Sequence, residues 1–282
     1  MPEAILVLLR HPEELDLLLG AATRLAQVMG RARINALAIR DTIHLVPAGA
    51  VTLADRSDAI LAAQDDERER VAALRASFDV WKVAMRGGAA EAHWFDAEGD
   101  ATELVVRWGR RADVIIVGRP SRGDVLGRQA LHTALFGTAR PILMMPPGPA
   151  EPEFGEQAVV PVFGRRIAIA WRNDRQAMRA VLPALRWFAD AEQVHVLMGV
   201  RAAAAPPEIP PILAEHGLVA NVHVLAIHPA PFGRTLLDAA HRLSADLLVM
   251  GAYAHSPLRE LVLGGVTRHM LAHADLPVLM RH

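Results

Sequence analysis

A glycine-rich stretch near the end of the chain has the composition of a phosphate-binding loop. Gly251 closes an apolar run, and Gly264 and Gly265 open a segment with helical spacing. Glycine lets a backbone approach a ligand closely, and the unpaired N–H groups at a helix start attract anions. Thr267 adds a hydroxyl group. The stretch is therefore a candidate anion site; the alternative is that the glycine pair only permits close packing of a helix on a sheet.

Other residues in the same region have the spacing of two further kinds of site. His269 and His273 are four positions apart on the expected helix, as in a two-histidine metal pair, but no Glu lies between them. His255 and Ser256 have the types of a base and a nucleophile, yet adjacent residues rarely face each other. Tyr253, the single tyrosine, suits either stacking on a base or capping the sheet edge. We expect neither metal nor catalysis here.

Composition excludes several classes of protein. The chain has 282 residues, 52% of them hydrophobic, with 30 Lys+Arg against 31 Asp+Glu and a net charge of −1. Such a chain can bury a large core in two domains, and it lacks the basic field of a nucleic-acid-coating protein. There is no cysteine, and Lys82 is the single lysine, so a Gly-Lys phosphate loop is excluded. We expect no targeting or membrane-spanning segment and a cytoplasmic location.

The elements that must position these residues alternate between short apolar runs and longer helical patterns. In the first half the spacing predicts helices and strands that suit a parallel sheet covered on both faces. The helices are 13–29, 57–85 and 102–111, and the strands are 5–9, 34–39, 91–95, 114–117 and 141–145.

The second half returns to the same order after a proline-rich break at 146–149. Its predicted helices are 174–189, with a kink or break at Pro183, and 235–243; its strands are 167–171, 194–200, 219–225, 247–250 and 277–280. We therefore predict an α/β chain of two tandem open-sheet domains, each with a mostly parallel five-stranded sheet. The expected boundaries are 1–147 for the first domain, 148–163 for a linker and 164–282 for the second domain.

The two halves also share short sequences. Ala112-Asp113-Val114-Ile115-Ile116-Val117-Gly118 returns 133 positions later as Ala245-Asp246-Leu247-Leu248-Val249-Met250-Gly251. Pro141-Ile142-Leu143-Met144 returns 136 positions later as Pro277-Val278-Leu279-Met280. This repetition indicates a duplication followed by divergence, in which the first half carries an additional charged helix at 57–85.

On these residues the chain resembles the universal stress protein family. Nucleotide-binding members carry Gly-x-x-Gly, nine residues, and then Gly-Ser or Gly-Thr after the fourth strand. Gly251 and Gly264 match two of these glycines, Ala254 stands at another, and Gly265 replaces the Ser or Thr. The closing segment 274–280 is also similar to the family's ending.

The resemblance implies a tandem universal stress protein, Rossmann-like in each repeat, that acts in the stress response as a dimer or a dimer-like pair of repeats. It further implies an adenine nucleotide such as ATP in the second repeat, with Mg²⁺ only together with the nucleotide. The site residues implied are Arg172, Asp174, Met250, Gly251, Ala254, Gly264, Gly265, Val266 and Thr267. Backbone N–H groups would meet the phosphates, and Arg172 or Asp174 would contact the nucleoside. An acidic residue is usual near that place, where Arg172 stands here.

The corresponding loop of the first repeat departs further from the family pattern. Gly118 is present, but Leu131 stands where the third glycine is expected. Arg119, Arg122 and Arg128 gather in this loop and offer an alternative way to hold an anion, through side chains.

We therefore expect a binding or regulatory module without catalysis. The first alternative is a slow ATPase, which needs a water-activating carboxylate, although Glu260 is the single acid between Gly251 and Thr267. The second is an interaction module without a small ligand. In that case the last strand of each half, 141–145 and 277–280, could pair between the halves or between two chains.

Overall fold

The computed structural model describes residues 3–30, 32–41, 53–85, 91–148, 161–189, 191–200, 211–217, 219–227, 231–252, 254–255 and 262–282. The first half runs β1 (Glu3–Leu9), a 3-10 turn η1 (Pro12–Glu14), α1 (Leu15–Met29), β2 (Ala32–Asp41), α2 (Leu53–Ala84), β3 (Glu91–Gly99), α3 (Ala101–Gly109), β4 (Val114–Gly118), α4 (Val125–Gly137) and β5 (Ile142–Met145).

The second half runs β6 (Arg166–Trp171), α5 (Arg175–Trp187), β7 (Gln193–Val200), α6 (Pro211–Glu215), β8 (Ala220–Ala226), α7 (Phe232–Arg242), β9 (Leu247–Gly251), β10 (Ala254–His255), β11 (Val262–Leu263), α8 (Gly265–His273) and β12 (Val278–Arg281). None of the described helices is long and apolar enough to cross a membrane.

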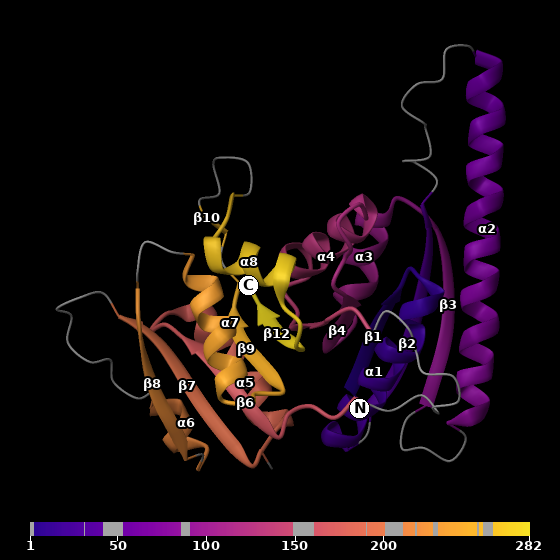
Figure 1. Ribbon diagram of the computed structural model, residues 1–282. Helices are drawn as coiled ribbons and strands as arrows, with labels where there is room; N and C mark the ends of the chain where they lie inside the picture. Colours follow the sequence, from indigo (N-terminus) through magenta and orange to yellow (C-terminus); the bar gives the residue numbers. More distant parts are fainter. Residues whose placement is uncertain are drawn as a thin grey trace.

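Each half contributes five parallel strands, and the two sets form one continuous sheet. The strand order is β3-β2-β1-β4-β5-β12-β9-β6-β7-β8. The second half therefore has the strand order of the first half, read in the opposite direction across the sheet. β5 and β12 pair antiparallel, with Leu143 opposite Leu279. Figure 1 shows the halves side by side, indigo to magenta for the first and orange to yellow for the second. The α/β class is confirmed, and the two predicted five-stranded layers join into a single ten-stranded sheet.

Alternating strand residues fill two cores, one on each face of the sheet. Ile5 and Val7 of β1 belong to the core under α1, α2, α5 and α6, whereas Leu6 and Leu8 belong to the core under α3, α4, α7 and α8. Both faces are apolar because helices cover both, as the crossover connections of a parallel sheet require.

The repeated Ala-Asp sequence has the same structural role in both halves. The Asp113 carboxylate accepts a hydrogen bond from the backbone N–H of Ala4 at 2.8 Å. The Asp246 carboxylate accepts one from Gly164 at 2.8 Å and also receives the N–H groups of Arg165 and Arg166. Each aspartate therefore ties the start of the half's first strand to the start of its fourth, which fixes the register of the β1–β4 and β6–β9 pairs.

Several sequence predictions need correction. The sequence predicted a kink or a break at Pro183; α5 is continuous there, so the break is wrong, and the packing of Ala180, Val181 and Ala184 in the core holds the helix together. α4 was not predicted, because the polar and glycine-containing stretch before it hides its periodicity. The end of the predicted linker packs into the core, since Phe163 is fully buried and its carbonyl accepts a hydrogen bond from Arg24 Nε at 3.3 Å.

Candidate nucleotide site

The candidate anion loop ends at a helix that no side chain caps. α8 begins at Gly265, its N-cap residue is Gly264, and no side-chain hydrogen bond caps it among the described residues. By contrast, aspartates cap three other helices, namely Asp100 at α3, Asp124 at α4 and Asp174 at α5. Among the described residues the start of α8 thus has no side-chain cap, which it shares with α1 and α7 but not with α3, α4 and α5.

A pocket of about 240 Å³ lies beside this helix start. Its walls include Trp171 at the end of β6, Gly199 of β7 and Gly251 at the end of β9. β6 and β9 are neighbours in the sheet although far apart in the sequence, so the pocket lies where the strand order reverses. This is the usual position of ligand sites in open α/β sheets, at the carboxyl ends of the strands.

The rest of the pocket wall is apolar. Leu197, Ile227, Phe232 and Leu236 line it, and no carboxylate does so among the described residues. A cavity with apolar walls and polar groups gathered at one end suits a ligand with a flat apolar part and a charged part. The apolar end lies against α7, and the polar end is the N-terminus of α8.

Most of the predicted site residues line this one pocket. They are Arg172, Met250, Gly251, Gly264, Gly265, Val266 and Thr267, and Thr267 is fully buried. Ala254 begins β10, which pairs antiparallel with β11. Tyr253 and Ser256 lie outside the described residues, as do the other residues of the loop from 257 to 261.

Asp174 is the N-cap of α5, the role that its position at the start of the predicted helix 174–189 indicates. Its carboxylate accepts the N–H of Ala177 at 3.0 Å as the N-cap of α5 and pairs with the guanidinium of Arg172. It is not among the residues that line the pocket. Arg172, which does line it, is therefore the group at the β6 end of the pocket that can meet a ligand, with Asp174 holding its guanidinium in place.

Sequence reasoning did not find the apolar wall. Leu197 and Gly199 are two positions apart and so lie on the same face of β7, and Phe232 and Leu236 lie one turn apart on α7. A Cβ at position 199 would lie 2.6 Å from the ring of Phe232, so only glycine allows this ring to lie against β7. In a sequence, apolar residues at strand ends cannot be distinguished from core residues. Gly199, a glycine inside a strand, was the one local indication that another group lies close to β7.

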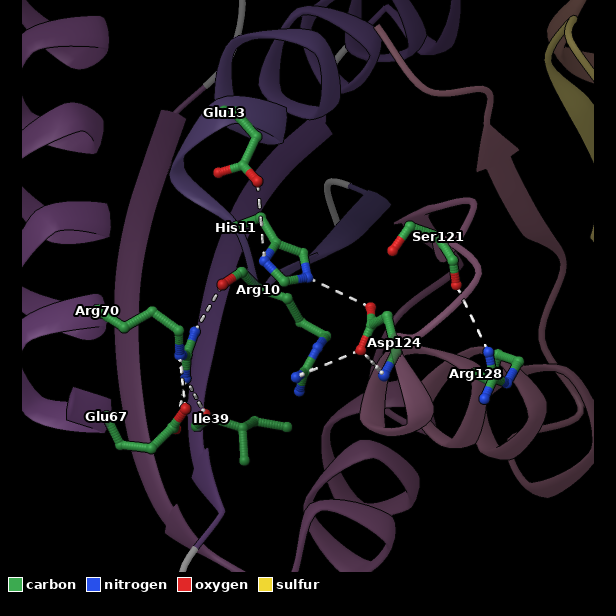
Figure 2. A network of polar contacts seen from close by, with 10 residues as sticks. Arg10, His11, Glu13, Ile39, Glu67, Arg70, Ser121, Asp124 and Arg128 are labelled. Atoms are coloured by element: carbon green, nitrogen blue, oxygen red, sulfur yellow. Dashed lines mark hydrogen bonds and ion pairs between the residues drawn. The ribbon is translucent and has the colours of Figure 1, made fainter. Parts of the chain in front are cut away.

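The corresponding place in the first half is filled by a network of the protein's own side chains (Figure 2). Asp124 caps α4 by accepting the N–H of Gly127 at 2.7 Å. His11 Nε2 lies 3.3 Å from the same carboxylate, and Arg10 forms an ion pair with it at 3.7 Å. Arg10 and His11 follow β1, so this carboxylate spans the crevice between β1 and α4.

Electrostatics agree with that geometry. Burial acts to raise the pKa of Asp124, but the N–H of Gly127 and the charges of Arg10 and His11 outweigh it and hold the pKa below its usual range. The nearby Glu14 is a different case, because burial raises its pKa. A Cβ at Gly118 would lie 2.7 Å from a Glu14 carboxylate oxygen, so this acid lies against the first glycine of the loop.

The additional helix of the first half also reaches this crevice. Arg70 of α2 donates hydrogen bonds to the carbonyl oxygens of Arg10 at 2.9 Å and Ile39 at 2.7 Å, and Glu67 holds its guanidinium (Figure 2). Figure 1 shows α2 standing beside β3 at the outer edge of the sheet. The carboxyl ends of β1 and β2 are thus bound to α2 in this half.

No group of three or more metal-ligating side chains occurs among the described residues. His269 and His273 do lie together on α8, with ring centroids 4.7 Å apart. Two imidazoles alone give half of the four ligands that a structural zinc site uses.

Comparison with known proteins adds a family resemblance. Residues 173–282 match the model of the universal stress protein family. This segment is therefore similar to a universal stress protein domain. It runs from Asn173, one residue before the N-cap of α5, to the last residue of the chain, and it contains the start of α8 and most of the pocket wall. No curated protein matches the chain.

Solved structures show the same fold over both halves. A universal stress protein from Archaeoglobus fulgidus DSM 4304 is 15% identical, with a TM-score of 0.63 over 99% of this chain and 95% of that chain. A functionally unknown protein from Pseudomonas aeruginosa PAO1 is also 15% identical, with a TM-score of 0.59 over 99% of this chain and 92% of that one. Both halves therefore share the fold of these solved structures, whereas the family model covers residues 173–282.

Proposed function

We propose that the chain is a tandem universal stress protein that acts in the stress response as a binding and regulatory module, and that its second half holds an adenine nucleotide such as ATP. One observation carries the nucleotide proposal. The equivalent helices of the two halves start differently: Asp124 caps α4, while Gly264 gives α8 no side-chain cap next to a pocket. A phosphate group would take at α8 the position that a carboxylate takes at α4.

The binding mode follows from the two ends of the pocket. The N–H groups of Gly265 and Val266 would donate to phosphate oxygens, and the adenine ring would lie against Phe232 and Leu236. The pocket volume of about 240 Å³ is below the range of roughly 300–1,000 Å³ that encloses a whole drug-sized ligand. The phosphates would therefore extend out of the pocket along the start of α8.

We further propose that the module is not an enzyme. Hydrolysis of ATP needs a carboxylate that positions water and usually Mg²⁺, and no carboxylate lines the pocket among the described residues. Any Mg²⁺ would come with the nucleotide and be held by its phosphates. The first half would bind no nucleotide, since its own carboxylates lie in the crevice.

The dimer-like arrangement would be complete within one chain. β5 and β12 bind each other's edges, so the strands at which two separate universal stress domains could join are already paired. We propose that the module works as a single chain in the cytoplasm, which size-exclusion chromatography with light scattering would test through its molar mass of 30.6 kDa.

The nucleotide proposal is tested by equilibrium binding of labelled ATP and by mass spectrometry of whatever the purified protein releases on denaturation. Ala170 lines the pocket and is half-buried, so Ala170→Leu should fill the apolar end and weaken ATP binding at least about tenfold. Ala62→Leu on the exposed side of α2 is the control and should leave binding unchanged. Absence of saturable binding at millimolar ATP would refute the nucleotide proposal and favour a protein-interaction module.

A further inference from the structure

A cavity of about 870 Å³ lies apart from the nucleotide pocket. It lies between the halves, with the loop after β4 and the outer face of α4 on one side and α8 on the other. It shares no residue with the nucleotide pocket: Arg268, Leu271 and His273 of α8 line it, whereas the first turn of α8 lines the other.

The cavity sits where the repeat symmetry brings equivalent helices together. His132 of α4 and Arg268 of α8 are 136 positions apart, the same offset that relates Pro141 to Pro277 at the β5–β12 pair. Both side chains line the cavity. Neither half could form this cavity alone, so whatever binds in it would contact both halves.

The side chains that line this cavity are strongly basic. Four arginines line it, namely Arg119, Arg122, Arg128 and Arg268, together with His132 and His273, and no described acidic residue does so. Within the described part of the chain none of these arginines forms an ion pair, whereas arginines elsewhere do, such as Arg40 with Asp96 and Arg75 with Asp79. Like charges gathered without acids repel each other unless an anion joins them.

One arginine is already positioned by the fold. Arg119 donates from a terminal nitrogen to the carbonyl oxygen of Ala272, in the last turn of α8, at 2.6 Å. Its Nε is buried and has no hydrogen-bond partner among the described residues. The fixed guanidinium therefore retains a donor at the boundary of the halves, and a buried donor without an acceptor is unfavourable.

We propose that this cleft binds a small anion carrying two or more phosphate groups. Planar guanidinium groups match phosphate oxygens with paired hydrogen bonds. Arginines from both halves would need more than one phosphate to be satisfied together, and the volume is ample for such an anion. Because the anion would contact α4 and α8 at once, its binding would strengthen the contact between the halves. The proposal does not depend on nucleotide binding at Gly265.

The test uses the full chain and inorganic tripolyphosphate as the probe, measured by titration calorimetry without Mg²⁺. Binding should be saturable and should weaken steeply as salt is raised. The double variant Arg122→Gln/Arg268→Gln, which removes one exposed arginine from each half, should weaken binding about tenfold or more. The control Arg68→Gln/Arg75→Gln on α2 removes the same charge far from the cleft and should leave binding unchanged. Circular dichroism would show that both variants fold.

Three outcomes would overturn the proposal. Equal loss of binding in the α2 control would mean that only the net charge matters. Sulfate binding as tightly as tripolyphosphate would mean that the cleft does not select several phosphates. A short single-stranded oligonucleotide that binds more tightly than tripolyphosphate, and loses this affinity in the cleft variant, would assign the cleft to a nucleic acid. In the variant Gly265→Asp, tripolyphosphate should still bind the cleft with unchanged affinity, which separates this site from the nucleotide pocket.

Discussion

Gly265 offers the sharpest test of how the second half would hold a phosphate. Its backbone opens α8, and a Cβ added there would meet no atom within 4 Å. The replacement Gly265→Asp should therefore fold without collision and place a carboxylate at the N-terminus of the helix. This carboxylate would sit where the proposal puts the phosphates of ATP, much as Asp124 sits at the start of α4.

The size of the effect follows from two opposing terms. A negative charge in the first turn stabilises a helix by about 0.3–1 kcal/mol, so the free energy of unfolding should rise slightly. The same charge about 5 Å from a phosphate costs about 1–3 kcal/mol of binding at an effective dielectric constant between 20 and 80. The Kd for ATP should therefore rise by about fivefold to 150-fold. Affinity and stability would change in opposite directions, which a general loss of structure cannot produce.

Equilibrium binding of labelled ATP and urea unfolding measure the two effects on the same protein sample. Gly265→Asn is the matched control, because Asn has the shape of Asp without its charge, and it should keep most of the affinity. If Gly265→Asp binds ATP as well as the unchanged chain does, the phosphates do not lie at α8 and the mode proposed here is wrong. If Asn and Asp weaken binding equally, the cause is steric and the electrostatic reasoning fails.

Three further predictions concern stability. Asp124→Ala should lower the free energy of unfolding by about 1–2 kcal/mol, while Asp124→Asn, which can still cap α4, should lower it less. Because the folded pKa of Asp124 lies below its ordinary 3.8, its contribution to stability should persist above that pH and vanish as the pH falls through the folded pKa. Urea unfolding at a series of acid pH values measures this loss. Glu14→Gln should raise the free energy of unfolding at pH 7 by about 0.5 kcal/mol, because burial raises the Glu14 pKa and disfavours its charged form, and partial exposure keeps the effect small. The gain should disappear below pH 4.5, and a gain that grows there would contradict the reasoning. Phe163→Ala should cost about 3–5 kcal/mol in urea unfolding, since this fully buried ring packs edge-on against Phe188 at 6.0 Å; a cost under about 1 kcal/mol would show that the segment before β6 adds little to the core.

The parts of the fold that the sequence predicted well are those with strong local signals. β4 and β9 are short apolar runs preceded by the same Ala-Asp pair, and their places in the two halves agree with the 133-residue repeat. α4 was missed because Gly123 and Gly127 interrupt its start. Asp124, which directly precedes α4, is a residue type that often caps helices, but it does not by itself predict a helix.

The sequence predicted the pocket residues that lie close together in the chain, but not those that distant elements bring to the pocket. Glycines and the expected helix start identified Gly251, Gly264 and Gly265, which line the pocket. Phe232 and Leu236 come from α7, and nothing local distinguishes them from core residues. The pairing of Asp174 with Arg172, and the position of Arg172 rather than Asp174 in the pocket wall, depend on side-chain directions that spacing alone does not determine.

The two halves show that one architecture can give an open or a filled crevice through a few side chains. Replacing Asp124 with glycine would uncap α4, but it would not open a pocket like the one beside α8. Glu14 would still lie against Gly118, and Arg70 would still bind the carbonyl groups at the ends of β1 and β2. The first crevice is thus filled from three elements, η1, α2 and α4, so at least three changes would be needed to open it. In the second half, by contrast, the N-cap of α8 is a glycine beside a pocket, and no carboxylate of the described residues lines that pocket.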